Sequence, residues 1–194
     1  MHLRIIDNLT AYDEERVARL ITTLPDWRRE AAIRYKFLAG KRECALGYDI
    51  LRQLLSEHYH VNDIPQFTYN SHGKPSLAEH PDIHFSISHC KEAVGCITDC
   101  VPCGLDIERI RPFNESLARY TMNEQEFHDI LSHAQPDVYF TALWTRKEAL
   151  LKLRGTGIDD NLKETLAPEK TKGIELETHI LPTYVYSITR ERTE

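Results

Sequence analysis

The order in which helical and strand patterns follow one another is the feature that most constrains the fold of this chain. Before residue 60 the patterns are mostly helical: one helix is predicted from Asp26 towards Phe37, and a second ends near His58. Short strand patterns are predicted at 84–88, 93–98, 105–108, 173–180 and 183–189. Because helices and strands come in mixed blocks, the sequence predicts an α+β fold.

Glycine, proline and capping residues set the expected boundaries. Gly40 is expected to interrupt or kink the first helical region, and the stretch 65–75 is predicted to be a loop. Asn123 is expected to open a helix that runs to about His133. Asp137 is predicted to cap a long helix that ends at Gly155.

Composition excludes several classes of protein. The 194 residues suffice for one domain or two small ones, and 24 Lys and Arg against 30 Asp and Glu give a net charge of −6. A broad basic field is therefore absent, which argues against nucleic acid as a partner. No run approaches the roughly 18 apolar residues of a membrane span, and Asp7 comes too early for the apolar stretch of a signal peptide, so we expect a cytoplasmic protein.

The cysteines are expected to be free thiols. The chain has five of them, an odd number, and four fall between Cys90 and Cys103. One Cys-x-x-Cys spacing is compatible with zinc, but the other spacings are irregular for such a site. A reducing compartment would leave all five reduced.

Two acidic residues on one predicted strand are the first candidates for a functional site. In 105–108, alternation places Leu105 and Ile107 on one face and Asp106 and Glu108 on the other, about 7 Å apart by two strand rises. Two carboxylates this close repel unless a cation or a proton lies between them, and hard oxygen ligands suit Mg²⁺. The alternative is a solvated strand face with nearby arginines as counter-charges.

The predicted helix 137–154 carries three further polar candidates. Lys147 falls near the centre of its apolar stripe, where it either snorkels or enters a buried ion pair. Glu148 lies at the edge of the stripe, so it is expected to be half-buried and to need a partner, such as a metal shared with Asp106 and Glu108. Lys152 lies one turn further and can contact a phosphate, although an exposed Glu148–Lys152 pair is the simpler interpretation.

Three weaker signals lie elsewhere in the chain. The turn Gly73-Lys74-Pro75 offers close backbone approach and one cation, and His89 ends a strand where it can donate to a phosphate. Glu126 follows Asn123 by three residues, a spacing typical of a capping box. Each of these has an ordinary structural explanation when it is taken alone.

Taken together, four motifs resemble one family, the Sfp-type 4′-phosphopantetheinyl transferases. They occur in the order of the family between Gly73 and Lys152. They read Gly73-Lys74-Pro75, Phe85-Ser86-Ile87-Ser88-His89, Gly104-Leu105-Asp106-Ile107-Glu108 and Trp144-Thr145-Arg146-Lys147-Glu148-Ala149-Leu150-Leu151-Lys152. Each motif alone is weak, but their ordered conjunction is specific.

The resemblance implies a reaction and a set of site residues. The phosphopantetheine arm of coenzyme A would move to a serine of an acyl or peptidyl carrier protein, with adenosine 3′,5′-bisphosphate as the leaving group. The metal, Mg²⁺ or alternatively Mn²⁺, would bind Asp106, Glu108 and Glu148, and Lys152 would contact the phosphates. The remaining implied contacts to coenzyme A come from Arg34, Gly73, Lys74, Pro75, Ser88 and His89. Glu126 matches the position at which some members place a further acidic residue near the carrier serine, so it is the candidate general base, and Glu148 and Lys152 are the other catalytic candidates.

The resemblance also implies an architecture of two pseudo-symmetric α+β halves with the site in the cleft between them. The halves are predicted at 1–103, with the coenzyme A nucleotide contacts, and 104–194, with the metal site. Because one chain is long enough for both halves, we expect a monomer. Arg28, Arg29 and Arg34 are candidates for a local basic patch that docks the carrier. Two alternatives remain open: a coenzyme A-binding module without activity, and a Mg²⁺-dependent phosphohydrolase.

Overall fold

Two three-stranded antiparallel sheets form the centre of the computed structural model, which describes residues 1–158 and 161–193. The first sheet has the order β1-β5-β4 and the second has the order β6-β8-β7. Their strands are β1 (His2–Ile6), β4 (His84–His89), β5 (Val94–Asp99), β6 (Cys103–Arg109), β7 (Ile174–Ile180) and β8 (Tyr184–Glu191). The predicted α+β class and all five predicted strands are confirmed, and β1 is an additional strand that the sequence analysis did not predict.

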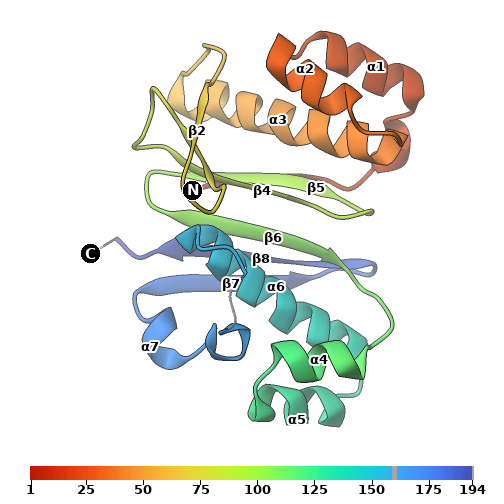
Figure 1. The fold of residues 1–194 in the computed structure, drawn as a ribbon, viewed down its shortest axis with the longest axis vertical. Helices are drawn as coiled ribbons and strands as arrows, with labels where there is room; N and C mark the ends of the chain where they lie inside the picture. The colour runs from red at the N-terminus through yellow and green to blue at the C-terminus, as the bar shows by residue number, and fades with distance from the viewer. Residues whose placement is uncertain (159–160, 194) are drawn as a thin grey trace.

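Helices cover the outer faces of both sheets (Figure 1). The long helix α3 lies against the first sheet, and α6 lies against the second. The α-helices are α1 (Glu14–Thr22), α2 (Asp26–Ile33), α3 (Leu38–Tyr59), α4 (Glu115–Thr121), α5 (Glu124–Ser132), α6 (Pro136–Arg154) and α7 (Pro168–Thr171), with 3-10 turns η1 (Leu9–Ala11) and η2 (Leu162–Glu164). No helix in the described part of the chain combines the length and apolar character needed to cross a membrane.

Strand alternation divides the apolar residues between two cores. On β5, Val94 packs in the core beneath α3, whereas Ile97 packs in the core between the two sheets. On β6, Leu105 and Ile107 join that second core and are 0% and 1% exposed. The opposite face of β6, which carries Asp106, is therefore turned towards α6, and the predicted assignment of the two faces is confirmed.

Three predicted helix boundaries differ from the structure. The first predicted helix ends at Ile33 rather than near Phe37, and Gly40 lies inside the first turn of α3 instead of breaking a helix. A Cβ at Gly40 would lie 2.8 Å from Cγ of Tyr35, so the glycine lets that ring pack against the helix. Helix α6 begins at Pro136, so Asp137 lies in the first turn and is not the cap.

The ends of the long helices agree with prediction. Helix α3 ends at Tyr59, next to the predicted His58, and α6 ends at Gly155, whose positive φ of 68° closes the helix in the left-handed conformation. Asn123 and Glu126 form the expected capping box at the start of α5.

The predicted loop at 65–75 is in part a hairpin. Strands β2 (Phe67–Tyr69) and β3 (Pro75–Leu77) pair on either side of the predicted turn, with Phe67 opposite Leu77. Both of these side chains pack into the core beneath α3, and this burial supports strands of only three residues. Such short strands carry too little alternation to be predicted from sequence.

Candidate active site

Two serines on β4 join the two sheets at their edges. Strands β4 and β6 are edge strands, and no strand pairing links them. Instead, Ser86 Oγ accepts a hydrogen bond from the N–H of Leu105 at 3.1 Å, and Ser88 Oγ accepts one from the N–H of Ile107 at 3.0 Å. The hydroxyls thus satisfy backbone donors that would otherwise be buried without a partner. This contact places the end of β4 beside Asp106.

Asp106 is the centre of a buried polar cluster. The residue is 3% exposed, and its Oδ1 accepts hydrogen bonds from Lys152 Nζ at 2.6 Å and from Ser88 Oγ at 3.1 Å. Lys152 Nζ also donates to Ser88 Oγ at 2.9 Å, so the hydroxyl uses its one donor and both acceptor positions. The solvated strand face is therefore excluded, because α6 covers Asp106 and Lys152 neutralises it.

Glu108 and Glu148 complete a group of three carboxylates. Burial, followed by the negative charge of Asp106, raises the pKa of Glu148 to about 7, and Lys152 opposes that shift. The same two causes raise the pKa of Glu108, while a hydrogen bond with Trp144 lowers it. Three carboxylates therefore share the field of one ammonium group, and their ionised forms favour a further cation.

The donor chemistry of this cluster suits a hard divalent cation, but the ligands are not assembled into a cage. Asp106 Oδ2 is buried and has no hydrogen-bond partner in the structure, as expected of an oxygen available for a cation. In the parts of the chain that the structure describes, no three His, Cys, Asp or Glu side chains are grouped closely enough to hold a metal ion as they stand. The ligand set predicted for Mg²⁺ or Mn²⁺ stays a prediction.

Two neighbouring pockets contain most of the predicted coenzyme A contacts. A pocket of about 340 Å³ is lined by Gly73, Lys74, Pro75, Glu148 and Lys152, and also by Gly155, Gly157 and Ile158. A pocket of about 500 Å³ is lined by Arg34, Pro75 and His89, together with Arg28 and Glu43. Pro75, Phe85 and Ile87 line both pockets, so the two volumes adjoin. Ser88 lines neither pocket, because its hydroxyl is turned towards Asp106.

The Gly73-Lys74-Pro75 turn is fastened to the end of α6. Lys74 Nζ donates to the carbonyl of Leu153 at 2.6 Å, and Asn70 Nδ2 donates to the carbonyl of Gly155 at 2.8 Å. Burial lowers the pKa of Lys74. Its ammonium therefore stabilises the C-terminus of α6 at the rim of the pocket. Sequence reasoning missed Asn70, although an Asn before a Gly turn is a recognisable signal of an Asx turn.

The second pocket is lined by nitrogen-bearing side chains from α2, the residue that follows it, and β4. Arg34 follows the end of α2 and is exposed, and His89 Nδ1 lies 3.3 Å from Glu43 Oε2. Arg28, named above only as a docking candidate, lines this pocket and donates to the carbonyl of Cys44. Arg29 instead faces Asp26 in an exposed ion pair.

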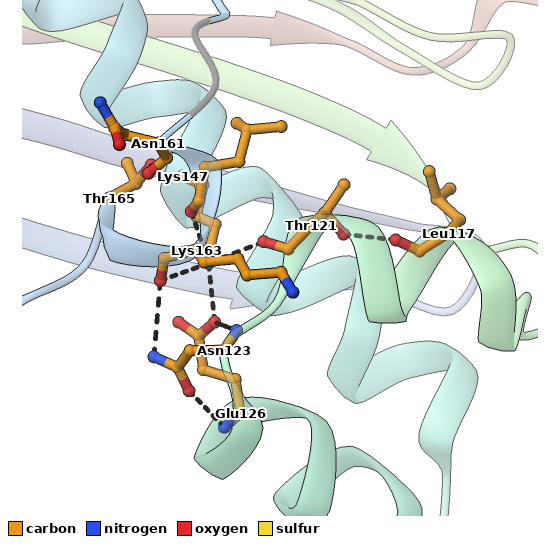
Figure 2. Close-up of polar contacts among 9 residues, drawn as sticks. Leu117, Thr121, Asn123, Glu126, Lys147, Asn161, Lys163 and Thr165 are labelled. Carbon is orange, nitrogen blue, oxygen red and sulfur yellow. Dashed lines mark hydrogen bonds and ion pairs between the residues drawn. The ribbon is translucent and has the colours of Figure 1, made fainter.

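Two sequence candidates lie outside these pockets. Lys147 is fully buried and its Nζ lies 2.6 Å from Glu126 Oε2, which resolves the open choice between snorkelling and an ion pair in favour of the ion pair (Figure 2). Neither residue lines either pocket. The structure therefore places Glu126 in a cap and an ion pair, apart from the carboxylates around Asp106.

The cysteines agree with the expectation of free thiols. All five are free: Cys100 is exposed and Cys44, Cys90, Cys96 and Cys103 are buried. Burial raises the pKa of Cys103 to about 12, so this thiol is protonated at neutral pH.

Comparison with known proteins identifies the class. Residues 102–190, which contain β6, α6 and the last two strands, match the 4′-phosphopantetheinyl transferase superfamily. The chain is 30% identical to 4′-phosphopantetheinyl transferase ffp of Bacillus subtilis. The alignment of 179 residues covers 89% of this chain and 80% of that relative. The chain belongs to this superfamily of transferases.

Within the superfamily, the chain resembles relatives of the Sfp type. It is 29% identical to 4′-phosphopantetheinyl transferase Sfp of Bacillus subtilis (strain 168) over 89% of this chain and 80% of that relative. It is 34% identical to 4′-phosphopantetheinyl transferase psf-1 of Bacillus pumilus over 72% of this chain, and that alignment spans only 61% of psf-1.

Proposed function

We propose that this protein transfers the 4′-phosphopantetheine arm of coenzyme A to a serine of an acyl or peptidyl carrier protein and releases adenosine 3′,5′-bisphosphate. The observation that carries the proposal is the position of Lys152. Its ammonium group binds Asp106 inside the carboxylate cluster, and the same residue lines the pocket that contains the Gly73-Lys74-Pro75 turn. A pyrophosphate in this pocket would therefore lie beside both the cation and the carboxylates.

Each group has a distinct role in this proposal. Asp106, Glu108 and Glu148 would hold Mg²⁺, or Mn²⁺, which when bound neutralises the charge that grows on the leaving bisphosphate. Lys152 would bind the phosphates as a point charge, and Ser88 would keep the Lys152 ammonium and the Asp106 carboxylate in place. The serine oxygen would form the new P–O bond as the pyrophosphate P–O bond breaks, and the serine proton would pass to a base.

The general base stays a prediction. Glu126 is the candidate that the family resemblance supplies, whereas its contacts with Asn123 and Lys147 favour a structural role. We propose Arg34, Lys74 and His89 as contacts for the nucleotide end of coenzyme A, since they line the two adjoining pockets.

We further propose the two-halves architecture, with a boundary near residue 103. Both sheets are antiparallel and have the same strand order. Of the three strands in each sheet, the one that comes first in the sequence lies at one edge, the last lies in the centre and the middle one lies at the other edge. The 340 Å³ pocket takes residues from 72–87 and from 148–158, so both proposed halves contribute to it. A monomer in the cytoplasm is the state that we expect for this enzyme.

The deciding experiment is a transfer assay with mass spectrometry of the carrier. The protein is incubated with coenzyme A, Mg²⁺ and an apo carrier protein, and we expect the carrier to gain one phosphopantetheine. If several carriers gain nothing while coenzyme A still binds, the binding-module alternative replaces the proposal. Release of adenosine 3′,5′-bisphosphate without a carrier would instead indicate the phosphohydrolase.

One substitution tests the site within the same assay. Asp106→Asn keeps the size of the side chain and one acceptor oxygen but removes its charge, so we expect it to lower transfer by at least about a hundredfold. Asp63→Ala, at an exposed position, is the control. Near-normal transfer by Asp106→Asn would refute the role of the cluster.

A further inference from the structure

An exposed segment rich in apolar side chains connects α2 to α3. Residues 33–39 are all exposed. Among the described residues, twelve large apolar side chains are exposed, and four of them lie in this segment: Ile33, Tyr35, Phe37 and Leu38. Single exposed apolar side chains are common on soluble proteins, whereas a contiguous group of them usually marks an interaction site. The segment is therefore a candidate for binding another molecule.

The same part of the chain concentrates positive charge. Residues 28–42 contain six Lys and Arg against one acidic residue, although the whole chain has a net charge of −6. Two of the cations are engaged within the fold, since Arg28 donates to the carbonyl of Cys44 at 2.9 Å and Arg29 donates to that of Leu24 at 3.1 Å. The basic surface that faces outward is therefore further along the chain than the arginines named from sequence.

An apolar hollow with lysines in its lining lies beside the segment. This pocket of about 290 Å³ is lined by Glu14, Val17, Ala18, Ile21, Ile33, Lys36, Leu38 and Lys41. Val17 and Ile21 are buried residues of α1, so the deeper part of the hollow is apolar. Two lysines against one acid give the lining a net positive charge. The hollow thus suits an apolar side chain presented by an acidic surface.

The segment also borders the pocket proposed for the nucleotide end of coenzyme A. Arg34 and Tyr35 line that pocket of about 500 Å³. Ile33, Lys36 and Leu38 line the apolar hollow. A protein that rests on the segment therefore lies beside bound coenzyme A, where a protein acceptor has to approach. This position favours the acceptor protein as the occupant over a membrane surface or a second copy of the chain.

We propose that the acyl or peptidyl carrier protein docks here, with an apolar side chain in the hollow and carboxylates facing Lys36 and Lys41. We call this surface, Ile33, Lys36, Phe37, Leu38 and Lys41, the docking face. The inference rests on the proposed function and names where its protein substrate binds. Because the ion pairs lie at the surface, they act mainly on association of the carrier and weaken as salt is added.

The test separates the charged part of the docking face from its apolar part. Transfer is measured with Lys36→Glu and Leu38→Gln at saturating coenzyme A and 0.15 M salt. We expect each to raise KM for the carrier about fivefold, and to leave kcat and Kd for coenzyme A within about twofold. At about 0.5 M salt, the effect of Lys36→Glu should shrink while that of Leu38→Gln persists. Lys172→Glu and Ile180→Gln make the same changes at exposed positions of the second half and are the matched controls.

Several outcomes would overturn the inference. One is an unchanged KM for the carrier in both folded variants, and another is a weaker affinity for coenzyme A alone. A dimer in analytical ultracentrifugation that Leu38→Gln dissociates would assign the docking face to a second copy. Sedimentation with vesicles of phosphatidylcholine and phosphatidylserine that Lys36→Glu abolishes would assign it to a membrane.

Failure of the proposed function gives a different result. If wild type modifies none of several carriers, the proposed transfer is wrong. Titration calorimetry of an apo carrier with wild type, Lys36→Glu and Leu38→Gln would still test the docking face. Weaker binding by both variants supports the inference, and equal binding by all three proteins overturns it.

Discussion

Gly104 is the position at which we expect the addition of a single methyl group to disturb the packing of α6 against β6 most strongly. It lies on β6 two residues before Asp106, where α6 packs against the strand. A Cβ built there would lie 2.7 Å from the backbone nitrogen of Leu153 and closer still to the carbonyl oxygen of Ala149. Both obstacles are backbone atoms of a long helix, so they cannot rotate away as a side chain can.

The magnitude of the effect follows from these distances. Ordinary carbon contacts need about 3.4 Å or more, so Gly104→Ala forces α6 away from β6 or twists the strand. Overpacking of this kind typically costs about 1–3 kcal/mol, and the rigid backbone places Gly104→Ala at or above the upper limit, about 3 kcal/mol. For a chain of this size, that corresponds to a fall of about 6–12 °C in the midpoint of thermal unfolding.

The prediction extends from stability to the site. Displacement of α6 lengthens the contact between Lys152 and Asp106, so transfer should fall in the folded fraction as well. Gly95→Ala is the matched control on β5, because the nearest neighbours of its new Cβ are apolar side-chain atoms rather than backbone, with Ile107 Cδ1 at 2.8 Å and Ile5 Cγ1 at 3.0 Å. We expect Gly95→Ala to cost less, about 1–2 kcal/mol. Thermal and urea unfolding of both variants measures the difference. If Gly104→Ala is as stable as wild type, or more stable than Gly95→Ala, the close approach of β6 and α6 is wrong.

Three further predictions test the electrostatics and the buried contacts. The folded-state pKa of Glu148 is raised from 4.5 to about 7, so ionisation of Glu148 destabilises the fold progressively as the pH rises through that window. One pKa unit corresponds to about 1.4 kcal/mol, which is discounted here because Glu148 is partly exposed. In EDTA, Glu148→Gln should therefore raise the free energy of unfolding by about 2 kcal/mol at pH 8 and by only about a few tenths of a kcal/mol at pH 5, and denaturant unfolding at both pH values checks this. Among the five thiols, Cys100 should react rapidly with a thiol reagent at pH 8, while Cys103, with its pKa of about 12, reacts only on unfolding; rapid labelling of two thiols would contradict this. Ser88→Ala removes the acceptor of the buried N–H of Ile107, so denaturant unfolding should show a free energy of unfolding lower by about 2 kcal/mol. An unchanged free energy of unfolding would argue against the hydrogen bonds between β4 and β6.

The parts of the fold that could be predicted from the sequence are those with a clear local period. On β6, the alternation of Leu105 and Ile107 with acidic residues gave the buried and polar faces, and both are confirmed. Gly155 marked the end of α6, and Asn123 with Glu126 marked the start of α5. These signals depend only on neighbours within one helical turn or one strand, so they can be recognised in the sequence without the tertiary structure.

The features that could not be predicted depend on contacts between distant segments. The hydroxyls of Ser86 and Ser88 accept hydrogen bonds from the backbone of β6 only because β4 and β6 both lie at sheet edges. The partner of Lys147 lies on a different helix, so the helical pattern alone left its ion pair undecided. Propensity likewise failed for α4 and for the short hairpin, where burial of Ala118 and Leu77 stabilises weakly patterned segments.

Helix α6 carries residues of two polar groups, the carboxylate cluster around Asp106 and the buried ion pair of Lys147 with Glu126. Glu148 and Lys152 lie about one turn apart on the side of the helix that faces the pocket, whereas Lys147 is rotated about 100° away, towards α4 and α5. A shift of this helix would therefore move Lys147 and Lys152 together. For this reason, the unexpected lysine in an apolar stripe is better explained by the requirement for a fixed helix than by the chemistry of transfer.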